Sequence, residues 1–191
     1  MNLPPSVADE MRAWTRANIP DSMLADDGRE EEPHVTALFG LHADNSDEVR
    51  AAVKGFGPIR VRLGRIATFS NDKYDVVKVN VESPDLHRLN AALRTLPHTN
   101  DFPDYQPHAT LAYVKKGEGK QFAGRRDFEG VEATFTDLLF SRKDRIKEPI
   151  ALAPTREGGL KTRTTAAQHE QQIDEEARRT LSASEDAPPA P

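Results

Sequence analysis

Residues 33–41 read PHVTALFGL and residues 107–114 read PHATLAYV, and the two stretches share one short pattern. In each, a proline precedes a histidine, and a threonine stands two residues after that histidine. The small and apolar residues around them are typical of a short strand, in which residues two apart point to the same side. The pattern therefore predicts two strands, each with a histidine and a threonine on one face and apolar side chains packed beneath.

The composition of the chain excludes several classes of protein. Its 191 residues contain 26 Lys and Arg against 31 Asp and Glu, and a net charge of −5 argues against coating of long nucleic acid. The absence of cysteine excludes disulfides, thiol nucleophiles and iron–sulfur sites. No apolar run has membrane-spanning length, and the N-terminal residues lack the pattern of a signal peptide. We therefore expect a cytoplasmic protein without membrane contact, whose oligomeric state the sequence leaves open.

The composition changes near residue 154, and this change divides the chain. Residues 154–191 contain few large apolar residues, too few to offset the entropy lost on folding. We predict a folded catalytic domain at residues 1–153 and a low-complexity, disordered tail at residues 154–191. One short helix at residues 165–181 is the only regular element that the tail pattern favours.

Periodic apolar residues in the first 153 positions predict the secondary structure. Helices are expected near residues 7–14, 46–56 and 84–96, and strands at residues 34–41, 59–64, 75–82, 108–114, 131–140 and 148–152. The acidic stretch at residues 26–32 is expected to be irregular. Strands that do not alternate regularly with helices favour an α+β fold. Because a helix precedes each histidine-led strand, we expect two related lobes that contribute one such strand each.

Two strands of this kind, placed side by side about a pseudo-twofold axis, would bring His34, Thr36, His108 and Thr110 into one cleft. One imidazole can then take a proton from a nucleophile while the other gives a proton to a leaving oxygen. The two hydroxyls can hold the non-bridging oxygens of a phosphate. This set matches an in-line displacement at phosphorus, and it needs neither a metal nor a cofactor. The sequence does not say which histidine is the base.

These motifs resemble those of the two-histidine (2H) phosphoesterases, a superfamily defined by paired His-x-Thr/Ser motifs. The resemblance spans residues 3–152. The segments PHVTALFGLH, GPIRVRLG, YDVVKVNVESPDLHRLN, YQPHATLAYVKKG and LLFSRKD are most similar to the phage anti-CBASS branch. This resemblance implies a bilobal fold of two pseudo-symmetric antiparallel-sheet lobes, with helices outside and a central cleft. It also implies that His34, Thr36, His108 and Thr110 are catalytic.

The anti-CBASS branch hydrolyses the cyclic oligonucleotide signals of bacterial antiviral defence, and this implies a metal-independent phosphodiesterase used in immune evasion. Its substrates would be 3′–5′ linked cyclic di- or trinucleotides, and a phage-encoded protein would act in the cytoplasm of the bacterial host. Attack by the ribose 2′-hydroxyl is favoured over attack by water. The alternatives are an RNA-end enzyme acting on 2′,3′-cyclic phosphates or 2′–5′ linkages, a non-catalytic nucleotide sponge, and a structural phage protein. Base preference and ring size stay open.

Five further residues are candidates for substrate contacts: Tyr105 and Tyr74 for stacking on a base, Lys115 for a phosphate, Glu132 for a base amino group, and Trp14. Each also has an ordinary structural interpretation, such as loop filling for Tyr105 or helix packing for Trp14. Phe69 is comparable to Tyr74 as a stacking residue. Arg60 and Arg62 either line the cleft or coat an exposed sheet. The remaining histidines, His42, His87, His98 and His169, are expected to be structural or exposed.

Overall fold

The computed structural model describes residues 1–99, 104–142, 144 and 146–153. Its elements are α1 (Pro5–Asn18), the 3₁₀ helix η1 (Asp21–Met23), β1 (Leu24–Arg29), α2 (Asp47–Ala52), β2 (Ile59–Ser70), β3 (Tyr74–Glu82), α3 (Pro84–Leu93), β4 (His108–Lys115), the 3₁₀ helix η2 (Gly119–Phe122), β5 (Glu132–Phe135), β6 (Asp137–Ser141) and β7 (Lys147–Ala151). The predicted tail, with its short helix and His169, lies outside the described residues.

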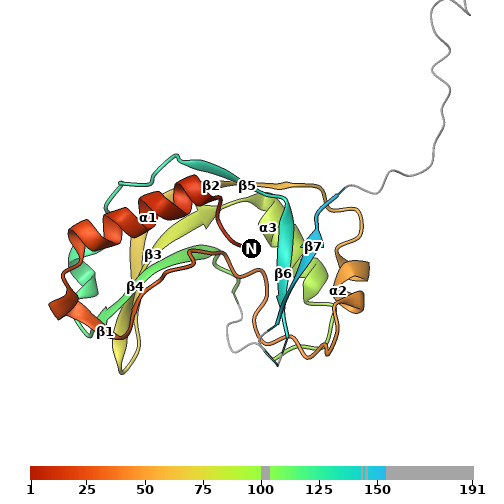
Figure 1. The fold of residues 1–191 in the computed structure, drawn as a ribbon, viewed down its shortest axis with the longest axis horizontal. Coiled ribbons are helices and arrows are strands. Elements are labelled where there is room, and N and C mark those ends of the chain that lie inside the picture. Colours follow the sequence, from red (N-terminus) through yellow and green to blue (C-terminus); the bar gives the residue numbers. More distant parts are fainter. Residues whose placement is uncertain (100–103, 143, 145, 154–191) are drawn as a thin grey trace, which may run out of the picture. The chain divides into compact units, whose positions relative to one another are not determined.

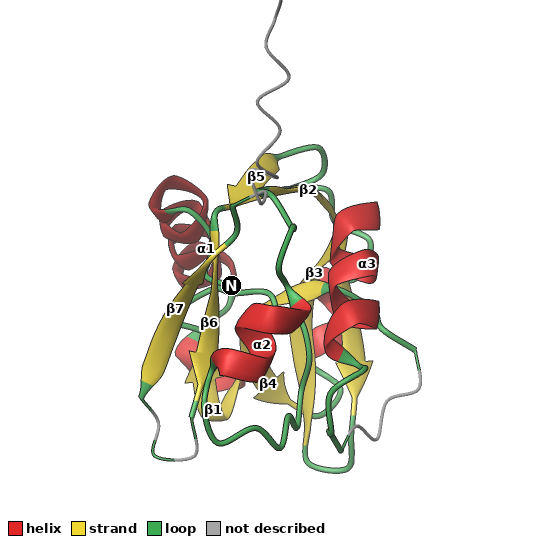
Figure 2. Ribbon diagram, turned by 90° about the vertical axis from the view of Figure 1, so that its right-hand side faces the viewer, coloured by secondary structure: helices red, strands yellow, loops and turns green. Residues whose placement is uncertain are grey.

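The strands form two antiparallel sheets, which confirms the α+β fold class. The larger sheet has five strands in the order β1-β4-β3-β2-β5, and it curls strongly (Figure 1). The smaller sheet is the β6–β7 hairpin, which lies near α2 (Figures 1 and 2). Because the two sheets differ in size, the structure does not show two pseudo-symmetric lobes.

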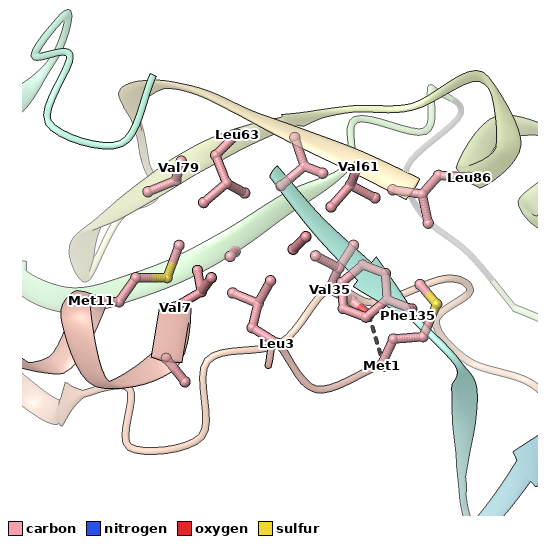
Figure 3. Close-up of a cluster of buried hydrophobic side chains, with 14 of the residues drawn as sticks. Met1, Leu3, Val7, Met11, Val35, Val61, Leu63, Val79, Leu86 and Phe135 are labelled. Atoms are coloured by element: carbon pink, nitrogen blue, oxygen red, sulfur yellow. Dashed lines mark hydrogen bonds between the residues drawn. The ribbon is translucent and has the colours of Figure 1, made fainter. Parts of the chain in front are cut away.

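The core lies between α1 and one face of the five-stranded sheet. Figure 3 shows Val7 and Met11 of α1 facing Leu63 of β2 and Val79 of β3. Val35 of the first motif joins this cluster and is fully buried. Burying such side chains contributes roughly 1.5–3 kcal/mol each relative to leaving them in water. The core thus fixes which face of the sheet remains open to a substrate.

Helix α3 forms where the local sequence predicts it. The Ser83 hydroxyl accepts a hydrogen bond from the Leu86 amide at 3.3 Å, and Pro84 occupies the first turn. Its leucines at positions 86, 89 and 93 are buried on one side. The cap and the proline therefore explain where this helix begins, and the apolar stripe explains which side of it is buried.

Three expectations about strands were wrong. Residues 26–32 are not irregular throughout, because β1 pairs with β4 as an edge strand that tolerates polar residues on both faces. Residues 131–140 form two strands rather than one, and β5 and β6 belong to different sheets. Residues 34–41 contain only isolated bridges instead of a continuous strand. Gly40 interrupts this run with a φ of 70°, and Thr99 O lies where a side chain at that position would begin.

In the part of the chain that the structure describes, no helix is long and apolar enough to cross a membrane.

Candidate active site

The two histidine motifs lie side by side, although their sequence separation is large. Val35 and Ala109 form an antiparallel bridge, and both side chains are fully buried in the core. The flanking residues of each motif therefore point to the opposite side, since side chains alternate along extended chain. The antiparallel register also sets His34 across from Thr110 and His108 across from Thr36. Opposed residues in such a pair have Cβ atoms about 4.5–5.5 Å apart.

Both imidazoles are oriented by the same local bond. Nδ1 of His34 lies 2.8 Å from Glu32 O, and Nδ1 of His108 lies 2.8 Å from Gln106 O. A carbonyl oxygen only accepts, so Nδ1 carries a proton in both rings and donates it. Nε2 of each histidine is consequently the atom available for proton exchange with a substrate.

The proline before each histidine explains this bond. The chain contains three Pro-His pairs, and in all three the imidazole Nδ1 bonds the carbonyl of the residue before the proline. The third pair is Pro97-His98, where the bond to Leu96 O is also 2.8 Å. Because the proline ring fixes φ, it holds the preceding carbonyl within reach of the imidazole. The shared proline is thus a positioning element for the ring.

The two histidines have unequal electrostatic surroundings. The pKa of His108 is lowered from its usual 6.5 mainly by burial, while the bond to Gln106 O acts in the opposite direction. The positive charges of Lys78 and His34 lower it further. His108 is therefore the neutral form at neutral pH, and neutral imidazole is the form that accepts a proton.

The face of the sheet opposite the core, here called the open face, is defined by His108 and Thr110 of β4 and by their neighbours Asn80 and Lys78 of β3. Asn80 pairs with His108 and Lys78 pairs with Thr110. Neither β3 residue was a candidate in the sequence analysis. The alternation in DVVKVNVE was the available signal, because it separates these two polar residues from the valines of the core.

Aromatic side chains surround the second motif. The ring of Phe69 packs edge-on to His108, with centroids 6.4 Å apart, and Tyr74 packs edge-on to Tyr113 at 5.4 Å. Tyr113 reaches the open face because β4 has a bulge at Leu111, which shifts the alternation by one residue. Of these rings, Phe69 is exposed, and an exposed ring can stack on a nucleobase.

Of the five predicted substrate contacts, Tyr105 lies beside the first motif, whereas Tyr74 pairs with Lys115 at the end of the sheet away from the motifs. Tyr74 lies on the open face through its contact with Tyr113. The Tyr105 hydroxyl donates a hydrogen bond to Thr36 O at 3.0 Å, and the ring packs edge-on to His87. Burial raises the pKa of this hydroxyl. Tyr105 therefore braces the backbone of the first motif.

The other three candidates also lie away from the paired motifs. Lys115, at the far end of β4, donates a hydrogen bond to Ser22 O at 2.7 Å. Glu132 lies on β5, the edge strand farthest from β1, where it pairs with Arg62. Trp14 is partly buried against the core, and its ring contacts Phe122 and Phe128 edge-on. The register of β2, β3 and β5 places Arg60 and Arg62 on the same side of the sheet as Glu132, beyond the second motif.

A cavity of about 830 Å³ opens beside the first motif. His34 and Thr36 line it together with apolar residues that include Phe39 and Leu138. This volume lies within the usual range of small-molecule sites, about 300–1,000 Å³. The site therefore has room for a nucleoside-sized group next to His34.

Among residues 1–99, 104–142, 144 and 146–153, no three His, Asp or Glu side chains are grouped so that they could hold a metal ion. The groups that the paired motifs and β3 bring together are two imidazoles, two hydroxyls and the ammonium group of Lys78.

A comparison with protein-family models agrees with this geometry. The model of the 2'-5' RNA ligase superfamily matches residues 3–145, and the chain belongs to this superfamily, that of the 2H phosphoesterases. Membership implies phosphoesterase activity on nucleotides and leaves the particular substrate open. The search of curated protein sequences found no match to the chain, so it does not narrow the choice of substrate.

Proposed function

We propose that the protein is a phosphodiesterase that cleaves 3′–5′ linked cyclic di- and trinucleotides, the signals of bacterial antiviral defence, and so blocks that defence. The observation that carries the proposal is the bridge between Val35 and Ala109, which brings the two His-x-Thr motifs together. The similarity of the motif segments to the phage anti-CBASS branch supports a cyclic substrate. The cavity beside His34 has room for one of its nucleosides.

In the mechanism that we propose, the ribose 2′-oxygen attacks the adjacent phosphorus. The new bond joins O2′ to phosphorus, and the bond from phosphorus to O5′ breaks. Nε2 of His108 takes the proton of the 2′-hydroxyl, and Nε2 of protonated His34 gives a proton to O5′. The lowered pKa of His108 supports its role as the base. The products are a 2′,3′-cyclic phosphate and a free 5′-hydroxyl on one linear nucleotide.

The threonines act on the charge of the phosphate. Thr36 and Thr110 belong to the same paired motifs as the two imidazoles, on opposite sides of the bridge. Their hydroxyls donate hydrogen bonds to the non-bridging oxygens, whose negative charge increases in the transition state. Internal attack gains from the neighbouring 2′-hydroxyl, which is already held close to phosphorus.

A second candidate is an RNA-end enzyme that opens terminal 2′,3′-cyclic phosphates or acts on 2′–5′ linkages. The description of the matching family model, the 2'-5' RNA ligase superfamily, favours it. The same acid–base pair would activate water or a terminal hydroxyl. Such an enzyme should prefer oligonucleotide ends over small rings.

The experiment that separates the candidates is incubation with cyclic di- and trinucleotides and with RNAs ending in a 2′,3′-cyclic phosphate, with products identified by mass. Our proposal expects ring opening to a linear 2′,3′-cyclic phosphate, and excess chelator should not prevent it. A cyclic dinucleotide with hydrogen in place of both 2′-hydroxyls should bind and resist cleavage. Activity confined to RNA ends would contradict the cyclic substrate, and rapid turnover of the deoxy ring would contradict ribose attack.

A further inference from the structure

We propose that Lys78 is a substrate-binding residue of this site, whose ammonium group pairs with a non-bridging oxygen of the scissile phosphodiester. The inference rests on the proposed function, because it assumes a phosphodiester at the paired motifs. It adds a residue outside the His-x-Thr motifs and gives it one chemical task.

The position of Lys78 follows from the register of β3. Lys78 pairs with Thr110 on β4 and with Ala67 on β2. Its neighbours in β3, Val77 and Val79, are fully buried in the core, so the Lys78 side chain lies on the open face. The charge of Lys78 also acts on His108. The ammonium group is therefore placed beside both members of the second motif.

In the described part of the chain, Lys78 has no acidic partner. The residue is only 7% exposed, and its Nζ donates to Asn80 Oδ1 at 3.4 Å, a long hydrogen bond with a neutral partner. Among the described residues, no carboxylate forms an ion pair with it. Burial accordingly lowers its pKa, which is the sign of a charge held at a cost.

A buried ammonium without a carboxylate partner is unfavourable for the fold alone. An apolar side chain would fit this position between Val76 and Ala67 without that cost. A phosphodiester oxygen would supply the missing negative charge, and its pairing with Lys78 would strengthen as charge builds on phosphorus. Asn80 then acts as a positioning residue, because its amide oxygen holds the ammonium group on the open face.

The test compares Lys78→Met, Lys78→Arg and a control, Lys54→Met, at an exposed lysine after α2. For each, the affinity for the 2′-deoxy cyclic dinucleotide is measured by calorimetry, and kcat/KM is measured with the ribose ring. Lys78→Met should weaken binding and lower kcat/KM by about 10- to 100-fold, as expected for lost hydrogen bonds to a charged group. Lys78→Arg should restore part of the loss, and Lys54→Met should match the wild type.

Two further measurements exclude a merely structural role. The melting temperature of Lys78→Met should equal or exceed that of the wild type, because the variant no longer buries a charge. The acidic limb of its pH–rate profile should move to higher pH, since Lys78 and His34 are the two cations that lower the pKa of His108. If Lys78 were merely structural, Lys78→Met would have a lower melting temperature than the wild type, and its pH–rate profile would not move.

The role of Lys78 and the proposed function are overturned by different results. If Lys78→Met binds and cleaves like an active wild type, the role of Lys78 is overturned and the proposed function stands. If the wild type neither binds nor cleaves any cyclic nucleotide, the proposed function is overturned, and the inference falls with it.

Discussion

The first motif, at residues 33–36, lies in an irregular segment attached by isolated bridges, whereas the second, at residues 107–110, begins β4, which has neighbours on both sides. The two share their residues and the bond from each imidazole to its own chain. The two motifs differ in their surroundings, because His108 lies beside Phe69 and the charge of Lys78 lowers its pKa. A repeated motif can therefore supply two chemically unequal histidines, as acid–base catalysis requires.

The difference also concerns how firmly each motif is held. The pairing of β4 with β3 fixes the second motif, because His108 and Thr110 lie across from Asn80 and Lys78. The first motif depends on its bridges to Asn2 and Ala109 and on the bond from Tyr105 to Thr36 O. We expect substitutions around the first motif to act through its position, and those around the second to act through charge.

The largest effect is expected from removing either imidazole. His34→Ala and His108→Ala should each lower kcat by roughly 10²- to 10⁴-fold, because a proton transfer loses its donor or acceptor. His98→Ala is the matched control, since His98 has the same proline and the same Nδ1 bond without the threonine. A comparable loss in His98→Ala with folding intact, or full activity in either motif variant, would show that the site is misplaced.

A smaller loss should follow from replacing either threonine by valine, which keeps the shape and removes the hydroxyl. Thr36→Val and Thr110→Val should each lower kcat/KM by about 10- to 100-fold, the usual range for hydrogen bonds to a charged group. Steady-state kinetics on the ribose ring provides the measurement. If both variants retain wild-type kcat/KM, the threonines do not contact the phosphate.

The prolines allow a more direct comparison of the two motifs. Pro33→Ala and Pro107→Ala each release the carbonyl that holds an imidazole, which should cost roughly 2- to 10-fold in kcat/KM. The loss should be larger for Pro33→Ala, because the first motif lies in an irregular segment, whereas the second belongs to a continuously paired strand. Pro97→Ala serves as the control. Equal losses in all three variants would mean that the proline acts on folding rather than on the ring.

The smallest effect concerns stability below pH 6.5. The folded-state pKa of His108 is lowered, so between that pKa and 6.5 the unfolded chain binds more protons than the folded chain. The free energy of unfolding should therefore fall as the pH falls through this window. His108→Gln should flatten this part of the profile, measured by chemical denaturation at a series of pH values. The same slope in the variant and the wild type would contradict the lowered pKa.

Local signals predicted much of the fold. Helix α3 follows from Ser83, Pro84 and its leucines, and the strand character of β4 follows from its apolar alternation. The break at Thr136 was missed, although the apolar residues that the structure buries change there from odd positions in β5 to even positions in β6. Strand β1 was missed because an edge strand with polar residues has no apolar alternation to detect.

The site was predicted only in part. The duplicated frame predicted His34, Thr36, His108 and Thr110, and the structure brings these two motifs together through the bridge between Val35 and Ala109. Lys78, which we propose to bind the phosphodiester, was not a candidate, because a polar residue in an alternating strand has the same pattern whether it faces solvent or a site. Only the pairing of β3 with β4 distinguishes the two, and such pairing depends on contacts between distant segments.

A double-mutant cycle tests most directly whether the two unequal motifs form one catalytic unit. The rate of ring opening would be measured in single turnovers for the wild type, His34→Ala, His108→Ala and the double variant. Because acid and base act in one step, the double variant should lose far less than the product of the two single losses. Losses that multiply fully would show two independent histidines and would contradict a shared site.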